Sequence, residues 1–211
     1  MIVLGNTRRL ILASASPRRQ SLLAQIVDKF DIKVADIDET PKMSEQAHNL
    51  VERLALFKAQ HVMKQCAKEY AHTEPSIKQH LLIGSDTVVA QSNSIFGKPK
   101  DYNEFASIMD QLSNNEHTVF TGVCVVSANN DFSDVTSYSK VLETKVSMAL
   151  ISEQEKRKYW ETKEPQDKAG GYAIQGIGGQ FVKEITGSFS AVVGLPLFET
   201  KQLLQKAISL Q

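Results

Sequence analysis

The segment Leu81–Ala90 constrains the fold of this chain more than any other. It is apolar except for Gly84–Thr87, and such a run is typical of a strand covered on both faces of a sheet. Asp86 lies inside the run, where burial makes its charge unfavourable unless a cation or a metal compensates it. A strand-end aspartate bonded to backbone N–H groups is the simpler explanation, but Ser85 and Thr87 make a polar patch around it. We therefore predict an interior strand that carries a functional carboxylate.

A basic helix start lies near the N-terminus. Leu10–Leu12 is predicted as a buried strand, and after a turn of small residues Ser16 is a good N-cap with Pro17 at the first helical position. Acidic side chains are usual in a first helical turn, yet this one carries Arg18 and Arg19, which suits an anion-binding site. The alternative is that both arginines extend into solvent. The buried stripe of this helix is expected at Leu22, Leu23 and Ile26.

The bulk properties exclude several classes of protein. With 211 residues the chain can form one large domain or two lobes that share a sheet. Its 24 basic and 24 acidic residues balance, so no broad field attracts nucleic acid or an anionic membrane, and any phosphate affinity must come from local clusters. No apolar stretch approaches the roughly 18 residues of a membrane span. The two cysteines form neither a disulfide framework nor a metal-type pair, and we expect a soluble, cytoplasmic protein.

The remaining pattern predicts an α/β protein with a mixed sheet, because strands and helices do not alternate strictly. The expected elements are a strand at Phe30–Val34 with one wet face, a helix from Ser44 to about Lys68, a loop around Pro75, a hairpin after Leu81–Ala90, a helix capped by Asp101, strands at Thr118–Ser127 and Thr136–Ala149, a helix opened by Ser152, an irregular glycine-rich segment at Gly170–Gly187, and a last helix from Pro196.

Two lysines are candidate phosphate ligands. Lys58 lies on the apolar stripe of the second helix, four residues after Leu54, so it either extends out to solvent or reaches a negative group. Lys98 follows the hairpin in Gly97–Pro99, which is not a Walker-type loop because Ser92 stands where the first glycine should be. An exposed turn lysine is the simpler explanation of Lys98 when it is considered alone.

Two further segments carry polar candidates. Glu39, with Asp36 and Asp38, gives carboxylates that suit Mg²⁺ held together with phosphate oxygens, although a solvated acidic turn explains them nearly as well. Gln175 lies in a glycine-rich stretch where it has the groups to read the hydrogen-bonding edge of a base, unless the glycines serve only tight bends. The cations and carboxylates together suit polyphosphate hydrolysis, in which cations and a metal neutralise the phosphates and a carboxylate takes a proton from water.

The chain resembles the Maf family of nucleoside triphosphate pyrophosphatases over nearly its whole length. The stretches that carry the resemblance are Ser14–Arg19, the acidic turn ending at Glu39, FKA around Lys58, Gly84–Val89, Gly97–Pro99, Phe120–Val123, Asp167–Gly176 and Gly187–Pro196. The resemblance implies a single domain over residues 1–211, an elongated mixed sheet flanked by helices around a central cleft, shared with inosine triphosphate pyrophosphatases. It also implies a homodimer.

The resemblance further implies hydrolysis between the α- and β-phosphates with a divalent cation, Mg²⁺ or Mn²⁺. Asp86 matches the family's proton acceptor, and Glu39 matches its metal partner. The sequence around Gln175 resembles the branch that acts on dTTP, UTP and modified pyrimidine nucleotides, so the expected substrate is a nucleoside triphosphate of that class. The positions that match base-selecting residues are Arg18, Thr87 and Gln175, and those expected to bind phosphate are Ser16, Arg18, Arg19, Lys58 and Lys98.

Three alternatives remain at this point. One is the same fold with purine or 7-methyl-GTP preference, against which Gln175 and Thr87 argue by resemblance. The second is a nucleotide-binding regulator of cell division without significant turnover, to which a carboxylate beside bound phosphates would be of no use. The third, a nucleic-acid-binding module, conflicts with the balanced charge. The segment after Lys58, through about His80, is expected to form an extra helical turn and a surface loop without a catalytic role.

Overall fold

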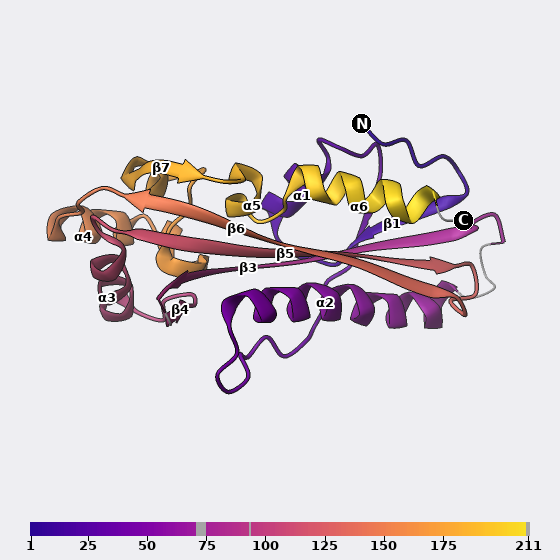
Figure 1. Cartoon of the computed structure of the whole chain (residues 1–211), viewed down its shortest axis with the longest axis horizontal. Helices are drawn as coiled ribbons and strands as arrows, with labels where there is room; N and C mark the ends of the chain where they lie inside the picture. Colours follow the sequence, from indigo (N-terminus) through magenta and orange to yellow (C-terminus); the bar gives the residue numbers. More distant parts are fainter. Residues whose placement is uncertain (71–74, 93, 210–211) are drawn as a thin grey trace. The chain divides into compact units, whose positions relative to one another are not determined.

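The computed structural model describes residues 1–70, 75–92 and 94–209, and over these residues the chain is an α/β protein with one mixed seven-stranded sheet (Figure 1). The strands are β1 (Arg8–Leu12), β2 (Asp31–Ile32), β3 (Gln79–Gln91), β4 (Ser94–Phe96), β5 (Glu116–Asn129), β6 (Val135–Met148) and β7 (Val182–Thr186). Their order is β2-β1-β3-β5-β6-β7, with β4 paired to β3. β1 is parallel to β2 and to β3, whereas β3–β4 and β6–β7 are antiparallel, which confirms the predicted mixed sheet.

The helices are α1 (Pro17–Leu23), α2 (Ala47–Tyr70), α3 (Tyr102–Leu112), α4 (Glu153–Glu161), α5 (Phe189–Val193) and α6 (Leu197–Ser209). Short 3₁₀ turns lie at Glu164–Asp167, Ala169–Gly171 and Ile177–Phe181. The described residues contain no helix long and apolar enough to cross a membrane.

The chain divides into two compact units. The first contains Met1–Asp86, Thr121–Val141 and Gly194–Gln211, and the second contains Thr87–Phe120 and Leu142–Val193. The division therefore falls within strands β3, β5 and β6, and in β3 it separates Asp86 from Thr87.

In the first unit, α2 lies on one side of the strands, and α1 and α6 lie on the other (Figure 1). Two glycines let α2 approach the sheet closely. A Cβ atom on Gly84 would lie 2.0 Å from the carbonyl oxygen of Ala55, and one on Gly122 would lie 2.3 Å from that of Val51. Any larger residue at these positions would push the helix away from the strands.

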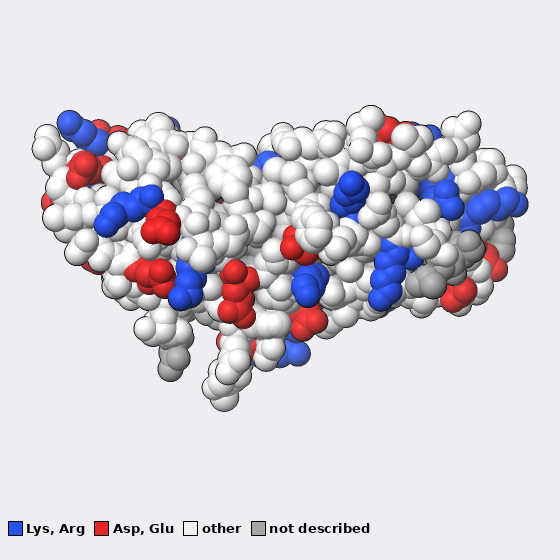
Figure 2. Space-filling view, turned by 45° about the horizontal axis from the view of Figure 1, so that its top comes forward, with Lys and Arg blue, Asp and Glu red and all other residues white. Residues whose placement is uncertain are grey.

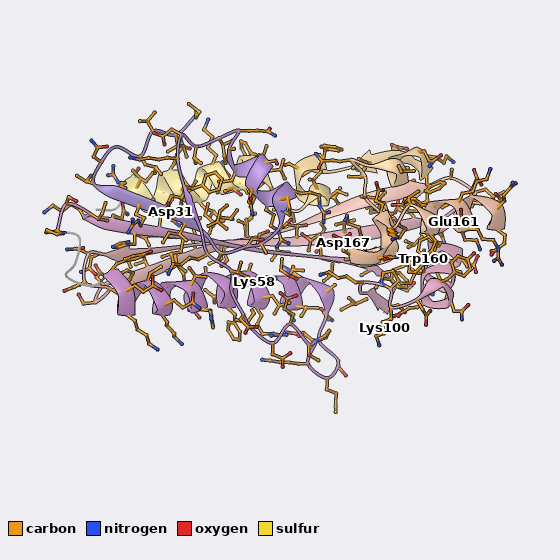
Figure 3. All side chains as sticks on the ribbon, turned by 180° about the vertical axis from the view of Figure 1, so that it is seen from behind. Asp31, Lys58, Lys100, Trp160, Glu161 and Asp167 are labelled. Atoms are coloured by element: carbon orange, nitrogen blue, oxygen red, sulfur yellow. The ribbon has the colours of Figure 1, made fainter. Side chains whose placement is uncertain are left out.

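The second unit has its own apolar core, in which aromatic side chains of α3 and α4 meet. Phe105 packs against Tyr159 and Trp160, with ring centroids 6.0 and 5.1 Å apart (Trp160 is labelled in Figure 3). Both helix starts have the predicted caps. Asp101 accepts the N–H of Glu104, and Ser152 forms a complete capping box with Glu155.

The prediction of a strand at Phe30–Val34 is wrong in two respects. The strand is shorter than expected, and two side chains expected on its buried face are exposed. Only Asp31–Ile32 pairs, and Ile32 and Val34 are exposed. β2 lies at the edge of the sheet, next to β1.

Two helix boundaries differ from the prediction, and one short helix was not predicted. α1 ends at Leu23, and the N–H groups of Gln25 and Ile26 then bond three residues back and tighten the turn, so Ile26 lies beyond the helix. α2 begins at Ala47 rather than Ser44, whose φ of 58° is left-handed and incompatible with a helix. The five-residue helix α5 was not expected within the segment that precedes Pro196.

The segment after Lys58 is helical up to Tyr70, and part of the expected loop, residues 71–74, lies outside the described residues. The expectation that this loop extends to His80 is wrong. His80 belongs to β3 and is fully buried.

Candidate functional site

A lysine and two carboxylates from three separate segments of the first unit meet at one point. The Nζ atom of Lys58, on α2, lies 2.6 Å from Oδ1 of Asp86 on β3 and 2.7 Å from Oε1 of Glu39 in the acidic turn (Lys58 is labelled in Figure 3). Asp86 and Lys58 are each only 6% exposed, whereas the side chain of Glu39 is 53% exposed. The structure thus joins a buried ion pair to a carboxylate that water reaches.

The local sequence explains why Lys58 points inward. Leu54 and Val62, four residues before and after it, are buried on the same face of α2. Gly84, two residues before Asp86, brings the helix close enough for the lysine to reach the strand. Of the two alternatives left open for Lys58, the structure shows contact with negative groups rather than extension to solvent, and the expectation that Asp86 is buried and paired with a cation is confirmed.

Arg19 is a second cation near these carboxylates. Its Nε donates to the carbonyl oxygen of Gly194 at 2.9 Å, and its Nη1 donates to Oγ of Ser14 at 3.4 Å. Burial lowers the pKa of Arg19, while the negative charges of Asp86 and Glu39 oppose that shift. Arg19 is therefore held within the first unit, and the alternative that it extends freely into solvent is wrong for this arginine.

The carbonyl oxygen of Gly194 accepts hydrogen bonds from two distant segments, which the sequence analysis did not predict. Oγ of the fully buried Ser85 lies 2.9 Å from this oxygen and 2.8 Å from the carbonyl oxygen of Gly122. Ser85 precedes Asp86, so one carbonyl links the strand of the buried aspartate to Arg19. The available signal was Gly194 itself, whose φ of 128° favours glycine.

The acidic turn is anchored to α2 by a second ion pair that was also missed. Arg53 binds Glu45 through two hydrogen bonds of 2.6 and 2.7 Å and donates to the carbonyl oxygen of Thr40 at 3.2 Å. The Arg53 hydrogen bonds lower the pKa of Glu45 to about 2. Thr40 follows Glu39, so the ion pair fixes the segment that presents Glu39 to Lys58. No local pattern in the sequence pairs Glu45 with Arg53.

Arg18 and Ser16 are half-buried at the start of α1. Ser16 occupies the predicted N-cap position, but its side chain makes no capping hydrogen bond. Arg18 forms no hydrogen bond or ion pair with the residues that the structure describes. Both side chains thus keep their hydrogen-bonding groups available for a ligand.

The remaining predicted site residues belong to the second unit. Thr87 is half-buried on β3, and Lys98 and Gln175 are exposed on loops. The N–H of Gly170 donates to the carbonyl oxygen of Gly97 at 3.0 Å, which ties the loop of Lys98 to the segment that leads to Gln175.

The carboxylates of the first unit suit a divalent cation. Asp86 and Glu39 converge on one ammonium group, and Mg²⁺ is typically held by one or two carboxylates together with substrate phosphates. Within residues 1–70, 75–92 and 94–209, no group of three or more His, Cys, Asp or Glu side chains is placed to hold a metal. The donor set therefore fits a metal whose other ligands come from the substrate and water.

Surface charge agrees with the balanced composition. On the face drawn in Figure 2, the basic and acidic side chains of the described residues are interspersed.

The fold and this site define a mixed-sheet α/β protein with a buried charged centre. The model of the Maf family, described as Maf-like protein, matches residues 9–207, and the chain belongs to this family. Three relatives are each named dTTP/UTP pyrophosphatase. The one from Colwellia psychrerythraea is 44% identical over 96% of this chain and 90% of its own. Those from Pseudoalteromonas translucida and Vibrio parahaemolyticus are 44% and 43% identical, over 94% and 93% of this chain and 97% and 96% of theirs.

Among solved structures, that of the Staphylococcus aureus Ham1 protein matches 66% of this chain and 72% of its own. The sequences are 11% identical and the TM-score is 0.34.

Proposed function

We propose that this chain hydrolyses dTTP and UTP to the nucleoside monophosphate and pyrophosphate. Relatives with that name are 43–44% identical over more than nine-tenths of this chain. The observation that carries the proposal is the buried Lys58–Asp86 pair with Glu39 beside it, because this chemistry needs a cation and a base at one place.

Asp86 acts as the general base in this proposal. Lys58 holds Oδ1, which leaves Oδ2 to accept a proton from the attacking water. The water oxygen bonds to the α-phosphorus as the bond from that phosphorus to the bridging oxygen breaks. Pyrophosphate then leaves with the electron pair of the broken bond, and the nucleoside monophosphate remains.

Cationic side chains bind the phosphates and stabilise the charge that develops on them. Lys58 already lies between two carboxylates, and Arg19 is held nearby by Gly194 and Ser14. The remaining phosphate ligands in this proposal are Ser16, Arg18 and Lys98.

Asp86 and Glu39 would hold the divalent cation, Mg²⁺ or Mn²⁺. When bound, that cation would neutralise the charge of the phosphate oxygens and favour loss of a proton from water. Lys58 fixes both carboxylates and limits the repulsion between them before substrate arrives.

Arg18, Thr87 and Gln175 select the base in this proposal. The exposed amide of Gln175 offers both a donor and an acceptor, which complement the N3–H and O4 groups of uracil and thymine. The family resemblance further supports a homodimer that acts in the cytoplasm.

A panel of nucleoside triphosphates, assayed with Mg²⁺ and with Mn²⁺, tests the function. We expect pyrophosphate rather than single phosphate as the product, with dTTP and UTP as the preferred substrates. Preference for a purine or for 7-methyl-GTP would place the chain in another branch. Tight binding of nucleotides without turnover would make it a nucleotide-binding regulator.

A further inference from the structure

The loop that carries Gln175 is tied down on both sides of this residue. Before it, the N–H of Ala173 donates to the hydroxyl oxygen of Tyr159 at 3.1 Å. After it, the N–H groups of Ile177 and Gly178 donate to the two carboxylate oxygens of Glu164, at 3.0 and 2.9 Å. The Tyr159 hydroxyl donates to Glu164 at 2.7 Å, so the contacts form one network.

This network is anchored in the core of the second unit. Tyr159 is only 2% exposed, and its ring lies 5.3 Å from that of Phe181. Burial opposes the ionised form of Glu164, but the N–H of Gly178, the hydroxyl of Tyr159 and the N–H of Ile177 outweigh it and lower the pKa of Glu164. The carboxylate is thus a fixed acceptor for the loop.

The loop backbone fits these two side chains closely. A Cβ atom on Gly176 would lie 2.1 Å from a carboxylate oxygen of Glu164, and one on Gly178 would lie 2.4 Å from the hydroxyl oxygen of Tyr159. Only glycine at both positions permits the observed contacts. Two glycines of the glycine-rich segment therefore serve a close approach to Glu164 and Tyr159.

The side chain of Gln175 contrasts with this fixed backbone. It is exposed and forms no hydrogen bond with the described residues, so its amide N–H and C=O groups are free for a ligand. An immobilised loop that presents an unused amide is preorganised for recognition, because little further ordering is needed on binding.

The position of the Gln175 amide matters for base selection, because the hydrogen-bonding pattern alone does not distinguish uracil and thymine from hypoxanthine and guanine. Hypoxanthine and guanine present the same N–H and C=O pair as uracil and thymine, but farther from the sugar. A glutamine on a loose loop would adjust to either distance. A glutamine on a fixed loop accepts the smaller base and discriminates against the larger one.

We infer that Tyr159 and Glu164 are positioning residues that hold Gln175 in place and thereby set the preference for pyrimidine over purine nucleotides. The inference rests on the proposed function, to which it adds the origin of base selectivity. Neither residue is required to touch the reacting phosphates.

Tyr159→Phe is the first test, with Glu164→Gln as the second variant. The phenylalanine keeps the ring in the core but leaves the N–H of Ala173 without its acceptor. The matched control is Tyr102→Phe, which removes a tyrosine hydroxyl of the same unit that is bonded to Glu153 at 2.6 Å and not to the loop. Thermal unfolding of every variant verifies that it is folded.

Steady-state kinetics with UTP and ITP give the decisive ratio. For both test variants we expect kcat/KM for UTP relative to ITP to fall roughly two- to tenfold, the equivalent of one hydrogen bond. We expect the control to keep the ratio of the unmodified chain. Equal losses for both nucleotides would overturn the inference, because a purely structural role affects every substrate alike.

A double variant tests whether Tyr159 acts through Gln175. Gln175→Ala should relax base choice more than it lowers the best rate, and adding Tyr159→Phe should then leave the UTP-to-ITP ratio unchanged. Amide hydrogen exchange of Ala173, Ile177 and Gly178 without ligand should become faster in Tyr159→Phe and stay slow in the control. Additive effects on the ratio, or unchanged exchange, would contradict the inference.

Calorimetric affinities for UMP and IMP separate this inference from the proposed function. If the unmodified chain releases no pyrophosphate from any nucleotide, the proposed function is wrong, but the affinity ratio still tests the loop. A ratio that falls in Tyr159→Phe and not in Tyr102→Phe supports the inference. The inference is overturned if the ratio of the UMP and IMP affinities is the same in the unmodified chain and in both variants. It is also overturned if neither nucleotide binds.

Discussion

Nζ of Lys58 and Oδ1 of Asp86 lie 2.6 Å apart in the first unit, although 28 positions separate the two residues in the sequence. Both side chains are buried, so water does little to compensate either charge. The pair is therefore both a structural element and the centre of the proposed chemistry. Replacing Asp86 and replacing Lys58 should accordingly have different effects.

Replacing Asp86 by asparagine should preserve the fold and lower kcat roughly 10²–10⁴-fold, the usual contribution of a general base. The amide oxygen still accepts a hydrogen bond from Lys58, but the group no longer takes a proton. Pyrophosphate release from UTP measures the effect. Asp110→Asn is a matched control, because Asp110 also binds a buried lysine, Lys156, at 2.6 Å. Near-normal turnover by the Asp86 variant would remove this residue from the mechanism.

Replacing Lys58 by methionine should destabilise the protein by about 3–5 kcal/mol, since it leaves a buried carboxylate without its cation. Urea unfolding measures this loss. A second substitution, Asp86→Leu, should restore much of the stability, because the remaining buried charge is then removed. If the double variant were as unstable as Lys58→Met, the ion pair would not be the source of the effect.

Replacing Glu39 by glutamine should raise the concentration of Mg²⁺ or Mn²⁺ that gives half-maximal activity. The variant keeps a hydrogen-bond acceptor near Lys58 but loses one of the two carboxylates proposed to hold the metal. Titration of activity with each metal is the measurement. The neighbouring Asp36→Asn should leave the metal requirement unchanged, and equal shifts in both variants would indicate only a general effect of charge.

The Glu45–Arg53 ion pair predicts a specific dependence on pH. The pKa of Glu45 falls from 4.5 to about 2 on folding, so its stabilising effect is complete above pH 4.5. The effect is then lost as the pH falls from 4.5 towards 2. The unfolding free energy of the unmodified chain, relative to that of Glu45→Gln, should decline over this window. If the difference in unfolding free energy between the unmodified chain and Glu45→Gln stayed constant from pH 7 to pH 2, the lowered pKa of Glu45 would be contradicted.

Replacing Gly84 by alanine should lower both stability and activity. The added Cβ atom would lie 2.0 Å from the carbonyl oxygen of Ala55, so α2 must shift away from β3 and carry Lys58 with it. Overpacking of this kind costs about 1–3 kcal/mol, and a displacement of about 1 Å at a reacting centre lowers the rate roughly 10²-fold. Gly97→Ala is the control for stability, since its added Cβ atom meets open space.

The features that sequence alone predicted are those determined by neighbouring residues. The apolar run Leu81–Ala90 indicated a buried strand, the helical spacing placed Lys58 on the inner face of α2, and local motifs gave the caps at Asp101 and Ser152. In each case the pattern and its structural consequence lie within a few residues of each other.

The features that sequence missed depend on contacts between distant segments. Ile32 is apolar yet exposed, because whether a strand is covered depends on its place in the sheet. The partners of Glu45 and Gly194 likewise follow from tertiary packing. The roles of Thr87, Lys98 and Gln175 stay predictions, and the Gln175→Ala variant addresses the last of them.

The shared carbonyl of Gly194 makes the C-terminal region part of the charged centre. Arg19 from the N-terminal region and Ser85 from the middle of the chain both reach this oxygen, and α6 begins three residues after it. A chain cut short before this glycine would leave the guanidinium without its anchor and a buried hydroxyl with one acceptor fewer. During synthesis, the centre therefore cannot be completed until Gly194 has emerged.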